Sequence, residues 1–273
     1  MAEVYEAEVY SFGGQPVKCS LTYRQAVERI RDGGAAAILL DMLEPDGLDA
    51  WWAGDAFPDV VRHRNFPTAA VSGIAIGGVQ RLEGANLVLG LIDYFSYAAR
   101  VNERLRESEF VKLCRRELGA ESVRIGAWGE LPLASRREFV KNHDGPYSVP
   151  PHCDAVHFGR DKANWPFKAG FSEGDFQISS VLTVGEAEND AGIVFWDLKP
   201  GTRPELDALM AEVSGPGGGA RLRDARSVTV RARAGQMTVL DTRLLHAVEQ
   251  CASPRRTIGA FLIWHDGCWR MFH

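Results

Sequence analysis

The stretch PYSVPPHCDAVHFGRD, residues 146–161, places a histidine and an aspartate two positions apart at the end of a β-type run. Side chains at positions i and i+2 of a strand leave on the same face, so His152 and Asp154 are predicted to point together. Farther along, LDTRLLHAVEQ, residues 240–250, offers His246 after a strand and a tight turn. Two imidazoles and one carboxylate on one face of an ion are the arrangement that binds non-haem Fe(II) and leaves coordination positions open. The sequence therefore predicts a metal site at His152, Asp154 and His246.

Two arginines follow His246 by nine and ten residues and open the run RRTIGAFLIWH, residues 255–265. A guanidinium stays charged and binds a carboxylate through two parallel hydrogen bonds, which suits a keto-diacid held near a metal. Thr257 lies two residues beyond Arg255, shares its face and adds a hydroxyl group. We therefore prefer Arg255 as the carboxylate partner. Arg256 stays open, because the inward face of the strand cannot be fixed from the sequence.

The chain changes character near residue 119. Before it, LTYRQAVERIRDGG (21–34) predicts a helix with a capping box at Thr22 and Gln25, followed by a buried strand at 35–41 and a long helical stretch at 83–118. After it, short β-branched and aromatic runs alternate with Gly, Pro, Asn and Asp clusters, which is typical of an antiparallel sandwich or barrel.

This layout predicts one domain over residues 1–273 that is mainly β with flanking α. Residues 1–119 would form a helical N-terminal support, and residues 120–273 a β-rich catalytic core. The segment 199–226 interrupts that core with a small helix and the run SGPGGG. A mobile lid and a passive surface excursion are equally open readings of this insertion.

Taken together, these motifs resemble the 2-oxoglutarate/Fe(II)-dependent dioxygenases. The matching features are HCD (152–154), the distal histidine in LLHAVE (244–249), and RRT (255–257), which looks like the Arg-x-Ser/Thr of that family. The segment FQISSVLTVGEAENDAGIVFWD (176–197) resembles its central strand pair. The resemblance implies a double-stranded β-helix, or cupin-like jelly roll, buttressed by the N-terminal helices. It also implies Fe(II) as cofactor and 2-oxoglutarate and O2 as co-substrates.

The resemblance further implies the reaction: decarboxylation of 2-oxoglutarate to succinate and CO2, coupled to attack on an unactivated C–H bond. Related halogenases carry Gly or Ala in place of the carboxylate ligand, so Asp154 favours hydroxylation, desaturation or ring closure over halogenation. We expect a small polar metabolite as substrate, such as an amino acid or a derivative. A nucleic-acid or protein demethylase is the alternative within the family, and the net charge of −5 and the pI of about 5.8 count against it. A non-redox, cupin-like metal-binding protein would have no use for an arginine behind the distal histidine.

Further candidate site residues flank these motifs. Gln177, on the predicted strand FQISS, is expected to face the cavity and to reach 2-oxoglutarate or the substrate. The strand SVRIGAW is expected to lie beside the metal-bearing strand. Five weaker candidates for substrate contacts, each with a plain solvated or packing role as the alternative, are Arg160, Asp161, Trp165, Arg124 and Glu130.

The cysteine content and the apolar runs indicate the cell compartment in which the protein works. The five cysteines are odd in number, scattered and without a CxxC pair, which argues against a disulfide framework or a thiolate zinc site. No cationic segment followed by an apolar run opens the sequence, and the apolar runs are too short to cross a bilayer. We therefore expect a cytoplasmic enzyme without membrane or nucleic-acid partners. A homodimer stays open.

Overall fold

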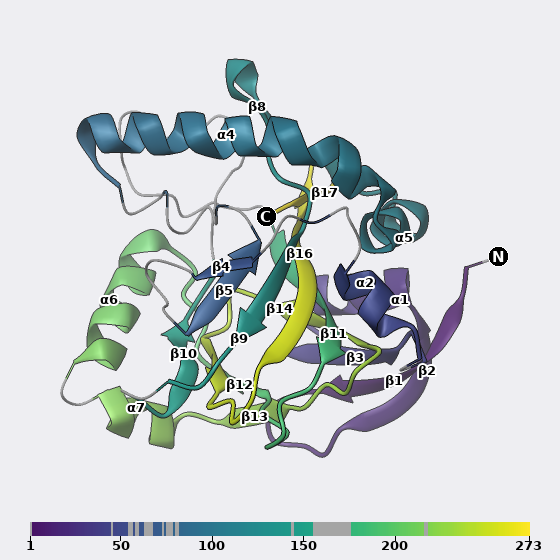
Figure 1. Cartoon of the computed structure of the whole chain (residues 1–273). Helices are drawn as coiled ribbons and strands as arrows, with labels where there is room; N and C mark the ends of the chain where they lie inside the picture. The colour runs from purple at the N-terminus through teal and green to yellow at the C-terminus, as the bar shows by residue number, and fades with distance from the viewer. Residues whose placement is uncertain are drawn as a thin grey trace.

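Two β-sheets pack face to face in the computed structural model, with helices along the outside of the larger one (Figure 1). The structure describes residues 2–44, 46–53, 57, 60–62, 68–72, 74, 79, 82–142, 145–154, 176–215 and 218–273. Within these residues, none of the helices is both long and apolar enough to span a membrane.

The larger sheet runs in the order β2-β1-β3-β14-β11-β16-β9-β5-β4, and β17 pairs with both β16 and β6. Its neighbouring strands are antiparallel except for the short β17–β6 pair. The strands are β1 (Val4–Tyr10), β2 (Val17–Thr22), β3 (Ala37–Asp41), β4 (Val60–Arg62), β5 (Ala69–Ser72), β6 (Glu121–Ser122), β9 (Ser135–Phe139), β11 (Phe176–Gly185), β14 (Gln236–Asp241), β16 (Arg255–His265) and β17 (Cys268–Phe272).

The smaller sheet has the order β10-β15-β12-β13. Its strands are β10 (Tyr147–His152), β15 (His246–Glu249), β12 (Ile193–Trp196) and β13 (Ser227–Val230). A separate hairpin pairs β7 (Arg124–Ile125) with β8 (Gly129–Glu130) around the 3-10 turn η1 (Gly126–Trp128).

Alternation along β11 separates the two faces of the larger sheet. Ile178 and Leu182 belong to the main apolar cluster, which contains helical side chains from α1, α4 and α5. Val181, one position before Leu182, instead packs with Phe195 of the smaller sheet. We call the face that carries Val181 the inner face and the other the outer face. Since successive strand residues point to opposite sides, the odd-numbered residues of β11, together with Arg255, Thr257 and Gly259 of β16, face the space between the sheets. Farther along the same face of β16, Phe261 and Ile263 pack with side chains of the Gly84–Glu107 helix.

Helices cover the outer face of the larger sheet (Figure 1). They include α1 (Tyr23–Arg31), α4 (Gly84–Glu107) and α5 (Glu109–Leu118), while α2 (Leu48–Ala53) lies near α1. The predicted capping box at Thr22 and Gln25 is present in α1. The single helical stretch predicted over 83–118 is two helices. Ser108 adopts an extended conformation between them, and its hydroxyl accepts the Val111 N–H to cap α5.

The N-terminal region also differs from the helical support that we predicted, because β1 to β5 extend the larger sheet at both of its ends. In β1, Tyr5, Ala7 and Val9 are buried while the intervening glutamates face outward. This is the period-two alternation of a half-buried strand. The insertion at 199–226 contains α6 (Arg203–Ser214) and α7 (Gly218–Asp224), whose apolar side chains pack against Trp196 and Ala247 of the smaller sheet.

Candidate active site

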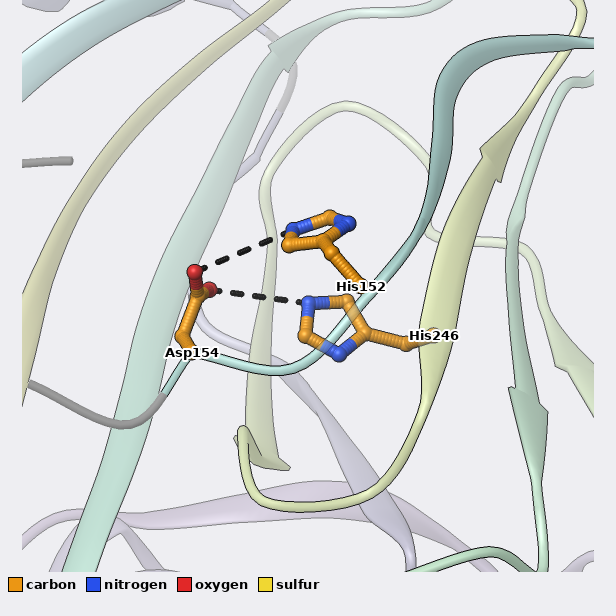
Figure 2. Close-up of side chains that lie close together, drawn as sticks. All are labelled: His152, Asp154 and His246. Atoms are coloured by element: carbon orange, nitrogen blue, oxygen red, sulfur yellow. Dashed lines mark ion pairs between the residues drawn. The ribbon is translucent and has the colours of Figure 1, made fainter. Parts of the chain in front are cut away.

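The smaller sheet brings the two predicted histidine ligands together. His152 ends β10 and His246 begins β15, and the two residues are direct partners in the antiparallel register. Their ring centroids are 4.3 Å apart. Asp154 lies two residues beyond the end of β10, and its backbone N–H donates to the Thr242 carbonyl at 2.9 Å, which fixes the chain next to the turn that leads to His246. Figure 2 shows the three side chains converging from these elements.

The distances within this triad suit a single ion. Asp154 places Oδ1 3.8 Å from Nε2 of His152 and Oδ2 3.6 Å from Nε2 of His246 (Figure 2). One ligand atom from each residue lies within 4.8 Å of the other two. Two nitrogen donors and one carboxylate, with no fourth protein ligand among the described residues, fit a ferrous ion that keeps positions open for other molecules.

Backbone carbonyls set the orientation of both imidazoles. Nδ1 of His152 lies 2.8 Å from the Pro150 carbonyl, and Nδ1 of His246 lies 2.9 Å from the Leu244 carbonyl. A carbonyl oxygen only accepts, so each Nδ1 carries the proton and each Nε2 presents its lone pair toward Asp154. Hydrogen bonds of this kind fix the tautomer and ring orientation of metal-binding histidines.

The triad also has the protonation states that a metal requires. Burial, together with the nearby His246, lowers the pKa of His152 to about 4. Burial alone would raise the pKa of Asp154, but His152, His246 and Arg137 hold that pKa well below its usual range. At neutral pH His152 is therefore neutral and Asp154 is ionised, so no proton competes with a cation at either residue.

A polar wall lies on the inner face of the larger sheet. Arg255 is only 2% exposed, and its Nε and Nη1 have no hydrogen-bond partner in the described part of the chain. Thr257 on β16 and Thr183 on β11 are direct partners across the sheet, and their buried hydroxyls likewise lack partners. Burying an unpaired guanidinium is costly, so this set of donors fits a ligand that brings a carboxylate.

The other two predicted co-substrate residues, Arg256 and Gln177, lie on opposite faces of the larger sheet. Arg256 lies on the outer face, where its Nε donates to Glu138 Oε2 at 3.0 Å and its side chain is 45% exposed. The structure therefore does not bring Arg256 to the wall that holds Arg255. Gln177 is fully buried on the inner face of β11, on the same side as Ser179.

The substrate candidates upstream of the triad lie elsewhere. Arg124 is exposed on β7, and Glu130 on β8 is paired with Arg106 and Ser122. The expectation that their strand borders the metal-bearing strand was wrong, because β7 pairs with β8 while β10 pairs with β15. The chain turns back at once through η1, so β7 and β8 close a two-stranded hairpin of their own. Three further candidates lie outside the described residues: Arg160, Asp161 and Trp165.

Arg137 is a further residue of this wall, and the sequence motifs did not predict it. Arg137 on β9 lies on the inner face opposite Thr257; the residue is partly exposed, but its Nη2 is buried and has no hydrogen-bond partner within the described ranges. The surrounding run SRREF lacks the β-branched residues that mark strands, so its alternation was hard to recognise. Two adjacent arginines within a short run between apolar segments were the available signal.

Comparisons with known proteins agree with this geometry. No protein-family model and no curated protein sequence matches the chain. Among solved structures, the crystal structure of an N-substituted L-amino acid dioxygenase from Burkholderia ambifaria AMMD is 36% identical, with a TM-score of 0.85 over 100% of both chains. The same enzyme in complex with α-ketoglutarate, which is 2-oxoglutarate, matches at 35% identity with a TM-score of 0.83, again over 100% of both chains.

Identity at this level over the full length confirms the predicted jelly-roll fold and the predicted enzyme class. The chain belongs to the 2-oxoglutarate/Fe(II)-dependent dioxygenases, and it is an enzyme that works with Fe(II), 2-oxoglutarate and O2.

Proposed function

We propose that this enzyme hydroxylates a C–H bond of an N-substituted L-amino acid or a similar small amino-acid derivative. The similar enzyme from Burkholderia ambifaria is described as a dioxygenase of N-substituted L-amino acids, and the likeness extends over the whole of both chains. Charged and hydroxyl groups on the inner face suit polar reactants.

We further propose roles for the individual residues. His152, Asp154 and His246 hold Fe(II), and Arg255 with Thr257 holds the distal carboxylate of 2-oxoglutarate. The observation that carries this proposal is the triad facing an inner wall whose buried guanidinium and hydroxyl groups have no partners in the described chain. A bound carboxylate would supply those partners.

Fe(II), O2 and 2-oxoglutarate together supply the oxidant for the C–H bond and yield succinate and CO2. The protein contributes position and exclusion of water. The Nδ1 hydrogen bonds of His152 and His246 keep both Nε2 atoms directed at one point. Phe195 stacks on the His246 ring at a centroid distance of 5.8 Å and shields it. Asp154 occupies the place where a halogenase would accept chloride, which favours hydroxylation.

Succinate formation tests this proposal directly. Purified enzyme with Fe(II), 2-oxoglutarate and O2 should form succinate together with a substrate product of 16 mass units more, a single added oxygen. N-acyl L-amino acids should be turned over faster than the matching free amino acids and than nucleotides. Turnover confined to peptides or nucleic acids would contradict the proposed substrate class. Succinate formation that never depends on added Fe(II) would contradict the proposed metal site.

We also propose that the chain unfolds as one unit and works in the cytoplasm. In support, β1 to β3 are hydrogen-bonded into the larger sheet, and one apolar cluster joins N-terminal helices to β11 and β16. The five cysteines are free thiols. A single unfolding transition by circular dichroism and by fluorescence would support the first point, and cell fractionation tests the second.

A further inference from the structure

Arg137 is a second buried guanidinium on the inner face, and neither the metal triad nor the proposed Arg255 site uses it. Its Nε donates to Ser135 Oγ at 3.3 Å, and its guanidinium carbon lies 5.5 Å from the centroid of the Phe261 ring. None of the ion pairs in the described part of the chain includes Arg137. One of its nitrogens, Nη2, is buried without a hydrogen-bond partner there.

The strand register shows where this guanidinium lies. Arg137 pairs with Thr257, and Ser135 pairs with Gly259, the next inward position of β16. Contacts with Ser135 and Phe261 therefore place the Arg137 guanidinium over Gly259, where β16 has no side chain. A Cβ at Gly259 would approach the Ser180 carbonyl to 3.0 Å, so a larger residue would strain this position. Arg255 lies on the same face, on the far side of Thr257.

The same position is close to the metal triad. The Asp154 N–H donates to the Thr242 carbonyl, and the Thr242 hydroxyl donates to the carbonyl of Gln177, which pairs with Ile263 of β16. The triad is therefore anchored toward the Phe261–Ile263 end of β16, the end opposite Arg255, and the Arg137 guanidinium beside Phe261 lies on the way to it. A diacid anchored at Arg255 and reaching the triad would follow the inner face of β16, past Thr257 and over Gly259. Its second carboxylate would then arrive beside Arg137.

From this arrangement we propose that Arg137 binds the 1-carboxylate of 2-oxoglutarate, the one next to the keto group, while Arg255 binds the carboxylate at the other end. The inference rests on the proposed function, because it takes Arg255 as the distal anchor. Each of the two guanidinium groups then has one carboxylate to neutralise it, and neither needs a partner from the protein.

Binding of two keto acids to the anaerobic Fe(II) enzyme tests this assignment. 2-Oxoglutarate has both carboxylates, whereas 2-oxopentanoate keeps the carboxylate next to the keto group and lacks the distal one. Dissociation constants come from titrating the visible charge-transfer band of each complex, without O2 or substrate. The variants are Arg137→Met, Arg255→Met and, as a matched control on the outer face, Arg256→Met.

We expect Arg137→Met to weaken the binding of both keto acids by the same factor, about 10- to 100-fold, as loss of a charge-assisted hydrogen-bonded pair predicts. Arg255→Met should weaken 2-oxoglutarate and leave 2-oxopentanoate unchanged, and Arg256→Met should change neither. An unchanged dissociation constant for 2-oxopentanoate in Arg137→Met would overturn the inference, even if 2-oxoglutarate binding fell. Absence of any 2-oxoglutarate complex in the parent enzyme would instead overturn the proposed function.

Thermal unfolding without ligand separates binding from folding. Because the substitution removes a charge that has no ion-pair partner, the ligand-free melting temperature of Arg137→Met should equal or exceed that of the parent. Addition of 2-oxoglutarate should raise the melting temperature of the variant by less than it raises that of the parent. If the methionine variant does not fold, Arg137→Lys keeps the charge but loses the planar fork. It should then weaken both keto acids equally, and unchanged binding would overturn the inference.

Discussion

Arg255 and Arg256 are neighbours in the sequence, yet they lie in opposite surroundings. Arg255 is buried on the inner face of β16 without a hydrogen-bond partner from the described residues. Arg256 lies on the outer face, half-exposed and paired with Glu138. A paired surface charge contributes little to stability, and a buried unpaired charge costs stability. Because the fold retains Arg255 at this cost, we propose that Arg255 binds a ligand.

The same contrast extends over the two faces of the larger sheet. On the outer face, Ile258, Ala260 and Leu262 pack into the main apolar cluster beneath the helices. On the inner face, β16 presents Arg255 and Thr257, and β9 presents Arg137. The outer face therefore stabilises the fold by burying apolar area. The inner face contributes less stabilisation of this kind, because polar side chains take the place of apolar ones there.

Asp154→Ala tests the metal centre that the inner face serves, and it should have the largest effect. Loss of the carboxylate ligand should lower iron content and reduce succinate formation by at least about 100-fold. Iron analysis of the purified protein and a succinate assay measure both. Asp93→Ala, at an exposed aspartate of α4, is the control. If Asp154→Ala retained the full iron content, Asp154 would not be a ligand of the iron.

Exchanging each neighbouring arginine for methionine measures the difference between the two faces. Arg255→Met should raise the dissociation constant of 2-oxoglutarate about 10- to 100-fold, because a charge-assisted hydrogen-bonded pair is lost. Arg256→Met should change it less than about twofold, in keeping with an exposed pair. Anaerobic titration or isothermal calorimetry checks both values. Equal effects, or the reverse order, would break the comparison.

Asp241→Asn contrasts a buried charge that has partners with one that has none. Asp241 is 3% exposed and accepts hydrogen bonds from Lys199 at 2.7 Å and from Arg243 at 2.9 Å. We expect the substitution to lower the free energy of unfolding by about 1–2 kcal/mol at pH 7, since both cations are partly solvated. In urea unfolding of the metal-free protein, Arg255→Met should not lower the free energy of unfolding.

The effect of Asp241→Asn should also depend on pH. Burial alone would raise the pKa of Asp241, but Arg243 and Lys199 lower it below its usual value. Stabilisation from such a carboxylate is fully present above about pH 4 and disappears as the pH falls through the lowered pKa. The difference between parent and variant should therefore stay constant from pH 7 to about pH 5 and shrink below about pH 4. A difference that grows on acidification would be inconsistent with this electrostatic role.

Thr257→Val should have the smallest effect and sharpen the comparison further. Because the Thr257 hydroxyl has no partner in the described structure, its loss should not lower the melting temperature of ligand-free protein. The dissociation constant of 2-oxoglutarate should rise about three- to tenfold, as loss of one hydrogen bond predicts. A clear fall in the ligand-free melting temperature would mean that the hydroxyl serves the fold instead.

Sequence reasoning predicted local features well where spacing and chemistry coincide. The capping box of α1, the strand containing Leu39 and Leu40, and the β-runs from Tyr147 onward all recur in the structure. The convergence of His152, Asp154 and His246 followed from their donor types, although almost a hundred residues separate the first pair from the last. A strand with strong periodicity, or a set of metal ligands with a known geometry, is compatible with few other structures.

Other features depended on tertiary packing, which the sequence does not reveal locally. The inward face of β16 is set by pairing with β9 and β11, so the choice between Arg255 and Arg256 was open until that register was known. Arg137 lies in a run that resembles a polar loop, and only its position opposite Thr257 explains why its Nη2 is buried. The break at Ser108 was hidden by helical periodicity on both sides of it.

The most direct test is a crystal structure of the enzyme with Fe(II) and 2-oxoglutarate, grown without O2, with the iron located by anomalous scattering. We predict one ion bound by Nε2 of His152, Nε2 of His246 and a carboxylate oxygen of Asp154, with the distal carboxylate of 2-oxoglutarate on the Arg255 guanidinium. An ion bound elsewhere, or 2-oxoglutarate that leaves Arg255 without a contact, would contradict this account.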